Sequence, residues 1–191
     1  MKLVYLPLLL LTLSANESAF AKEAVRKDWK KMENIHGWSM QHPASWHWEK
    51  SDGVPVDRDD MAALLLHEGS DPKTKRGSGV IVESKGPREF KYPLKDMMED
   101  KHGSSPAVRG EEGHETRIDG FPAYDEVVVT RGPFDEKMHF SREIYVNKGG
   151  NLFIIKYGEH VAEEGIPKKD WKNEAVFNEM LSTFKFIPEK P

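Results

Sequence analysis

The 191-residue chain contains no cysteine. This absence excludes disulfide bonds, a thiol nucleophile, thiolate metal ligands and a lipid-modified cysteine that would tether the protein to a membrane. The chain also lacks a basic excess, because 28 Lys and Arg residues stand against 32 Asp and Glu residues and are scattered among them. Domains that bind nucleic acid usually gather basic residues on one face, so we expect no nucleic-acid partner.

Apolar runs of membrane-spanning length, about 20 residues, are missing as well. The N-terminus carries a shorter run: Lys2 precedes the apolar stretch from Leu3 to Leu13, and Ala19-Phe20-Ala21 follows. A positive start, an apolar core of this length and a small-x-small site are typical of a cleaved export signal. We therefore expect residues 1–21 to be removed, and the mature chain to be soluble in the periplasm or outside the cell.

The rest of the chain has the length of one ordinary domain. Residues 22–36 are rich in Lys and Glu, with a few apolar residues at roughly helical spacing, which predicts an N-terminal arm or a short helix. We expect residues 37–191 to form a single domain.

Apolar patterning predicts several strands. The run from Met61 to His67 is ambiguous, because its Ala, Leu and Met residues favour a helix whereas its short length favours a strand. Residues 104–116 are polar and contain glycine, and no strand is predicted there. Glycines 149 and 150 favour a tight antiparallel hairpin. The clearer strand predictions are residues 37–41, 46–48, 80–82, 124–130, 138–146 and 152–157.

Two helices are predicted. Pro93 can begin the first, which would end at Gly103. Asp170 can cap the second, whose apolar residues follow the spacing of a buried stripe. That stripe consists of Phe177, Met180, Leu181 and Phe184. Because several strands are apolar on both faces, the sheet needs cover on both sides. The expected fold class is α+β: an antiparallel sheet of about six strands sandwiched between helices, an α/β/α arrangement.

Four short motifs stand in order along the chain. They are Gly37-Trp38-Ser39-Met40-Gln41-His42-Pro43 followed by Trp46, Ile118-Asp119-Gly120-Phe121-Pro122-Ala123-Tyr124, Asn151 to Tyr157, and Phe177 followed by Leu181-Ser182-Thr183-Phe184-Lys185-Phe186. Together they resemble the PsbP-like family, which is named for the extrinsic subunit of photosystem II, and the resemblance covers most of residues 37–187. It implies an α/β/α sandwich in which Met61 to His67 is a strand, and a group of accessory or binding proteins rather than enzymes with a shared active site. Many exported bacterial relatives carry a lipid-attachment cysteine, which this chain lacks.

We assign no catalytic, cofactor or metal residue from the sequence. The nearest metal candidate is the group His36, His42 and His47, with Glu49 close by. The odd spacing of His42 and His47 puts them on opposite faces of a straight strand, unless Pro43 bends the chain. The group is better explained by a turn histidine and a solvent-facing histidine.

Other candidate chemistry is also sparse. His139 and Glu143 share a strand face but lie too far apart to bind one ion without a third, cross-strand ligand. Gly77-Ser78-Gly79 is the nearest phrase to a nucleophile elbow, and a loop leading into a strand explains it better. Trp46 and Trp48 face the same way in an extended segment, and we expect a core pair rather than an exposed platform for a sugar or peptide.

These observations predict an exported, soluble accessory or binding protein without catalytic activity, whose partner is a protein of the cell envelope. Two alternatives stay open. One is a metal-dependent or hydrolytic extracytoplasmic enzyme that uses the histidines around residues 36–47. The other is a carrier whose small ligand lies between sheet and helix. The sequence predicts neither a cofactor nor an oligomeric state.

Overall fold

The computed structural model describes residues 28–34, 37–49, 62–66, 77–87, 93–103, 107–131, 138–161 and 164–188. The predicted export signal and His36 lie outside these residues. The described chain forms two antiparallel sheets and two α-helices.

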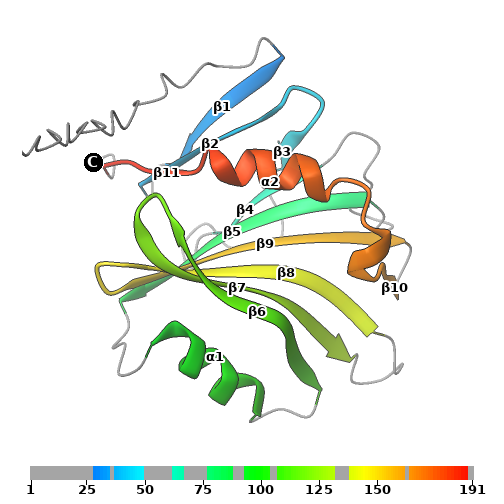
Figure 1. Cartoon of the computed structure of the whole chain (residues 1–191). Helices are drawn as coiled ribbons and strands as arrows, with labels where there is room; N and C mark the ends of the chain where they lie inside the picture. The colour runs from blue at the N-terminus through cyan, green and yellow to red at the C-terminus, as the bar shows by residue number, and fades with distance from the viewer. Residues whose placement is uncertain are drawn as a thin grey trace, which may run out of the picture.

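The larger sheet has eight strands, two more than the sequence predicts. They are β3 (His47–Glu49), β4 (Ala62–Leu66), β5 (Gly77–Pro87), β6 (Val108–Ile118), β7 (Phe121–Arg131), β8 (Met138–Lys148), β9 (Asn151–Val161) and β10 (Glu164–Gly165). Their order is β3-β4-β5-β9-β8-β7-β6, with β10 beside β9 (Figure 1). Every neighbouring pair is antiparallel.

The smaller sheet shows that the prediction of a helix or loose arm for residues 22–36 is wrong where the structure describes them. Its strands are β1 (Trp29–Asn34), β2 (Trp38–Pro43) and β11 (Lys185–Phe186), in the order β1-β2-β11. β1 pairs with β2 over its whole length. Trp29 and Met32 also pack against the core. Hydrogen bonding and burial together outweigh the helix propensity of the Lys- and Glu-rich sequence.

The helices lie on opposite sides of the larger sheet, which confirms the predicted α+β class and α/β/α arrangement (Figure 1). They are α1 (Leu94–Gly103) and α2 (Glu174–Ser182). Asp170 is not the cap of α2, because it belongs to the 3-10 turn η1 (Lys168–Asp170) and Asn173 occupies the N-cap position. Neither helix among the described residues is long and apolar enough to cross a membrane.

Two further stretches show how pairing decides secondary structure. The ambiguous run from Met61 to His67 contains β4, as the family resemblance implies, and β4 is held between β3 and β5. No strand is predicted at 104–116, yet most of this stretch belongs to β6. β6 is polar because it is an edge strand, and its pairing with β7 supplies the order that its own sequence does not signal.

Two hairpin turns follow from local sequence. Gly149 and Gly150 have φ values of 59° and 95°, and the β8–β9 hairpin closes over them as predicted. Asp119 and Gly120, at 49° and 82°, close the β6–β7 hairpin in the same way. Two successive residues of positive φ make the type I′ turn that matches the twist of paired strands.

The larger sheet has a separate apolar core on each face. On the α1 side the core residues are Leu94, Met98, Tyr124, Tyr145, Leu152 and Ile154. On the α2 side they include Trp38, Met40, Trp46, Ile144, Ile155, Phe177, Met180 and Phe184. Trp46 is thus a core residue, as expected, while the side chain of Trp48 lies outside the described part. Val127 to Val129 are all buried, which confirms that the sheet is covered on both faces.

Replacing Phe177 by alanine should test how far α2 contributes to this core. Phe177 is 0% exposed and stacks on Tyr157 with the ring centroids 4.7 Å apart. We expect Phe177→Ala to lower the free energy of unfolding by about 3 to 5 kcal/mol in chemical denaturation. Val176→Ala, at a half-buried neighbouring position, is the control and should cost about 1 kcal/mol. Equal losses of unfolding free energy in the two variants would contradict the placement of Phe177 at the centre of this core.

Candidate functional site

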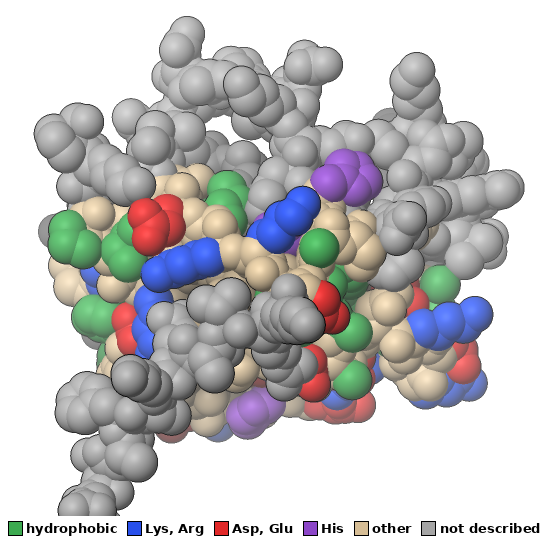
Figure 2. Space-filling model, turned by 90° about the horizontal axis from the view of Figure 1, so that it is seen from above, with side chains coloured by type: hydrophobic (Ala, Val, Ile, Leu, Met, Phe, Trp, Pro, Cys, Tyr) green, Lys and Arg blue, Asp and Glu red, His purple; other side chains and the backbone are tan. Residues whose placement is uncertain are grey.

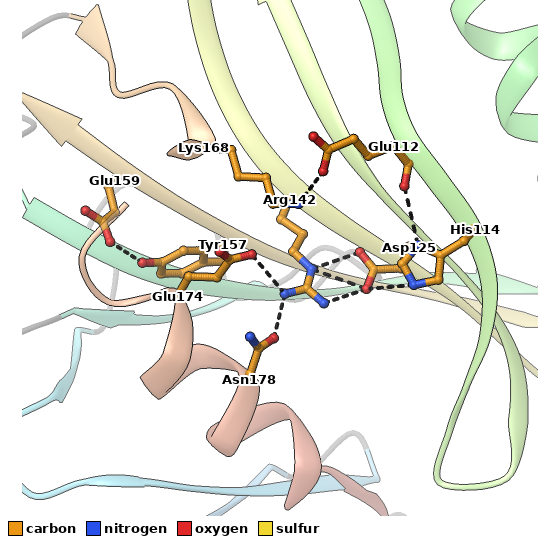
Figure 3. Close-up of polar contacts among 9 residues, drawn as sticks. All are labelled: Glu112, His114, Asp125, Arg142, Tyr157, Glu159, Lys168, Glu174 and Asn178. Atoms are coloured by element: carbon orange, nitrogen blue, oxygen red, sulfur yellow. Dashed lines mark hydrogen bonds and ion pairs between the residues drawn. The ribbon is translucent and has the colours of Figure 1, made fainter. Parts of the chain in front are cut away.

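A cluster of charged side chains joins α2 to the larger sheet (Figure 3). Arg142 on β8 binds Asp125 on β7 with two nitrogens: Nε lies 2.9 Å from Oδ1, and Nη2 lies 2.7 Å from Oδ2. Its third nitrogen, Nη1, donates to Asn178 Oδ1 on α2 at 2.6 Å and lies 3.5 Å from Glu174 Oε1. All three guanidinium nitrogens therefore have an acceptor, and one side chain links two strands and a helix.

The pair of Arg142 and Asp125 is nearly enclosed. Their side chains are 14% and 6% exposed. The hydrogen bonds to Asp125 raise the pKa of Arg142 above its ordinary value, against the effect of burial. Arg142 also lies over the ring of Phe177, with its guanidinium carbon 5.4 Å from the centroid. A bidentate geometry of this kind offsets much of the desolvation of both charges.

His114 lies at the open end of the cluster. Its side chain is 63% exposed, and its Nε2 is 4.0 Å from Asp125 Oδ2. A β-bulge between Glu111 and His114, with Glu112 at a φ of 54°, interrupts the pairing of β6 just before this residue. Glu112 forms an ion pair with Lys168 of η1. The bulge thus sets the position of His114, and the ion pair of Glu112 ties β6 to η1.

A groove of about 340 Å³ opens beside the cluster, between α2 and β6. Ile118, Leu181 and Phe184 contribute its apolar lining. Its polar lining includes two carboxylates, Asp119 and Asp125, which are paired with Lys185 and Arg142. The other polar lining residues can donate hydrogen bonds, and they are His114, Thr116, Arg117, Asn178 and Ser182. An imidazole, a guanidinium, an ammonium and an amide around an apolar surface suit a ligand that combines an apolar group with a carboxylate or carbonyl.

Charge around the groove is mixed. The described part of the face seen in Figure 2 carries basic, acidic and apolar side chains side by side, and no patch of a single sign covers it. Lys185 pairs with Asp119 at 3.1 Å. Arg117 donates to the backbone oxygen of Gly120 at 2.7 Å and has no carboxylate partner among the described residues. Arg117 therefore keeps donors available to a ligand.

A second polar group holds the start of α2. Glu159 on β9 is 4% exposed and accepts a hydrogen bond from the backbone N–H of Asn173 at 2.6 Å and another from the hydroxyl of Tyr157. Burial and the bond to Glu159 raise the pKa of Tyr157, which keeps its hydroxyl protonated as a donor. A carboxylate at a helix N-terminus stabilises the helix, so Glu159 anchors α2 to the sheet.

Ser78 belongs to the same group. It lies within β5, not in a loop before a strand as expected, and its hydroxyl accepts a hydrogen bond from Asn173 Nδ2 at 2.9 Å. The phrase Gly77-Ser78-Gly79 is thus part of a strand that braces the start of α2.

A third polar group lies on the α1 side. Glu126 and Glu143 are directly opposite each other on β7 and β8 and are 3% and 8% exposed. Tyr145 donates to Glu143 Oε2 at 2.6 Å, and burial together with these two carboxylates raises the pKa of Tyr145. Lys156 lies 3.8 Å from Glu143 Oε1 and 3.6 Å from Glu83 Oε2. Lys85 lies 3.1 Å from the same oxygen of Glu83, so two lysines offset two of the three carboxylates.

The histidines considered from the sequence are placed apart from these groups. His42 is buried in β2, with Nδ1 2.9 Å from the oxygen of Pro43, and His47 is exposed in β3. His139 is half-buried on β8. Among the described residues, no three His, Asp or Glu side chains are grouped so that they could hold a metal ion.

Sequence reasoning considered Ser78 and Glu143 only for other roles and missed the other residues of the three polar groups. One signal was available: Asp125 and Glu126 interrupt an apolar run between Tyr124 and Val127. A charge inside an otherwise buried strand requires a partner. The partner itself, Arg142, could not be identified without the strand pairing.

The comparisons with known proteins bear on the fold. No protein-family model and no curated protein matches the chain. Cyanobacterial PsbP (CyanoP) from Synechocystis superposes with a TM-score of 0.53 over 86% of this chain and 95% of its own, at 12% identity. The fold is PsbP-like.

Two other solved structures share this PsbP-like fold. LpqN, involved in cell envelope biogenesis of Mycobacterium tuberculosis, matches 84% of this chain and 92% of its own, with a TM-score of 0.52 and 13% identity. PA94 from Pseudomonas aeruginosa, a protein of unknown function, matches 85% and 98%, with a TM-score of 0.51 and 12% identity. Likeness at this level of identity shows the architecture alone.

The buried ion pair should be strongly coupled. Arg142→Met keeps most of the apolar stem but leaves the Asp125 carboxylate enclosed without its counter-charge, so we expect a loss of about 3 to 5 kcal/mol in the free energy of unfolding. The double variant Asp125→Val with Arg142→Met should lose much less than the sum of the two single variants in chemical denaturation. Additive losses would show that the two side chains do not stabilise each other.

His42 should make stability depend on pH. Burial lowers the pKa of His42 below 6.5, so the unfolded chain takes up the proton at a higher pH than the folded chain. The free energy of unfolding should therefore fall as the pH drops through about 6.5, and this part of the fall should disappear in His42→Gln. His47→Gln, at an exposed position, is the matched control and should keep the wild-type slope. If His42→Gln kept the wild-type dependence of unfolding free energy on pH, His42 would not contribute to that dependence.

Proposed function

We propose that the protein is an exported accessory protein that binds a protein partner of the cell envelope through the groove between α2 and β6, without catalysing a reaction. The observation that carries the proposal is the groove itself: an apolar lining with exposed donors, built on a cluster whose own charges are already paired. Residues 1–21 support export, and the PsbP-like fold is shared with LpqN, which is involved in cell envelope biogenesis.

The geometry around His114 favours binding over catalysis. A general base or nucleophile needs its orienting partner within hydrogen-bond distance. Asp125 Oδ2 is 4.0 Å from the imidazole, while both carboxylate oxygens accept hydrogen bonds from Arg142. The carboxylate therefore neutralises the guanidinium, and the imidazole Nδ1 lies 3.4 Å from the backbone oxygen of Glu112 instead.

The lining indicates what the partner presents. His114 and Lys185 offer N–H donors to a carboxylate, and the half-buried Leu181 offers an apolar surface a short distance away. The proposed partner segment carries an acidic side chain next to an apolar one. The donors at the rim provide orientation, and the apolar contact provides most of the affinity.

Site-specific photo-crosslinking in the source cells tests the groove. A photo-reactive residue at Ser182, which lines the groove, should give one discrete adduct with an envelope protein. The same residue at Ala175, exposed on α2 but not among the lining residues, should give none. With the purified partner, Ser182→Trp should abolish binding because the indole fills the groove, whereas Ala175→Trp should bind like the wild type. Equal amounts of adduct at both positions would contradict the proposal that the partner binds at the groove.

The export part of the proposal has its own measurement. Protein isolated from the cell envelope should begin near Lys22 by mass spectrometry. A chain that retains residues 1–21 and stays in the cytoplasm would contradict export, but it would not contradict binding at the groove.

A further inference from the structure

β6 forms one edge of the larger sheet, and no strand pairs with its outer side in the described part of the chain (Figure 1). From Arg109 to Arg117 its residues are exposed, apart from the half-buried Glu111 and Thr116. Every second residue of an edge strand directs its N–H and C=O away from the sheet, and another strand can pair with them. This edge is therefore available for strand addition.

The regular part of the edge is short. The β-bulge between Glu111 and His114 interrupts the pairing of β6 with β7. From His114 to Ile118 the register is continuous. A strand added to β6 therefore meets five regularly spaced residues, and the bulge limits how far it can extend.

Open space borders this stretch on both faces of the sheet. Glu115 and Arg117 line a groove of about 460 Å³ that also contacts the start of α1. His114 and Ile118 line the groove of about 340 Å³ beside α2. Alternate side chains of an added strand would face these two grooves, beside the start of α1 on one face and α2 on the other.

The charges on the edge have a specific pattern. Glu115 and Arg117 point to the same face, because they are two residues apart and lie opposite Tyr124 and Pro122 of β7. Neither has an ion-pair partner in the part of the chain that the structure describes. They carry opposite signs and lie at equal distances along the strand from Thr116.

We propose that two copies of this chain associate by antiparallel pairing of their β6 strands about a two-fold axis at Thr116. In this register Thr116 lies opposite Thr116 of the second copy. Glu115 of each copy lies opposite Arg117 of the other. Both unpaired charges of both copies thus gain a partner, and the two eight-stranded sheets become continuous.

The charge pattern favours antiparallel pairing with a second copy over parallel pairing. Charges on edge strands usually oppose association, since an incoming strand brings like charges together. Parallel, in-register pairing of two β6 strands would do so, with Glu115 facing Glu115. Antiparallel pairing at Thr116 is self-complementary. The inference does not depend on the proposed partner groove, because it needs only the edge of β6.

Charge reversal tests the dimer in the full mature chain. Sedimentation velocity should show a wild-type dimer whose dissociation constant rises with salt. Glu115→Arg and Arg117→Glu should each raise that constant by more than about tenfold, because each variant alone brings two pairs of like charges together. Lys172→Glu, at an exposed residue outside β6, is the control and should leave the dimer unchanged.

Two rescues separate this register from a general loss of structure. An equimolar mixture of Glu115→Arg and Arg117→Glu should form a one-to-one heterodimer, since every Arg then faces a Glu. The double variant that carries both substitutions should restore the homodimer. A monomeric wild type, a dimer that survives both single reversals, or a mixture that stays monomeric would overturn the proposal.

Discussion

The bidentate pair between Arg142 and Asp125 is the interaction on which the arrangement of this protein most depends. Either charge alone would be costly in so enclosed a position, and together they neutralise each other. Because Arg142 also binds Asn178 and lies over Phe177, the pair fixes α2 on the sheet. The position of α2 in turn forms one wall of the groove. The candidate site therefore depends on an ion pair that lines the groove and whose two charges are already satisfied by each other.

The other buried polar groups apply the same constraint elsewhere. Glu159 accepts a hydrogen bond from the backbone N–H of Asn173 at the start of α2. On the α1 side, Glu143 accepts a hydrogen bond from Tyr145 and lies near the ammonium group of Lys156. Each group joins neighbouring strands or joins a strand to a helix, so a register slip of one residue would separate charges from their partners. Such groups favour one specific packing of the sheet. They also leave the exposed donors near β6 as the polar groups most available to other molecules.

β6 connects the fold to both proposals. It provides residues to the grooves on the two faces of the sheet, and its outer edge carries a self-complementary pair of charges. Its bulge positions His114 and limits the regular edge to five residues. The PsbP-like architecture is shared with proteins that are only 12 or 13% identical, so these local features, rather than the fold, distinguish this chain.

The sequence by itself determined the features that depend on neighbouring residues. Consecutive glycines predicted the β8–β9 turn, apolar periodicity predicted α1 and α2, and strands without alternation predicted a sheet covered on both faces. Tertiary structure alone decided that the polar stretches containing β1 and β6 are strands, because hydrogen bonds from adjacent strands stabilise them against their own weak propensity. It also decided which charges meet. Asp125, Arg142 and Asn178 are distant in the sequence, and only strand pairing and helix docking bring them within hydrogen-bond distance.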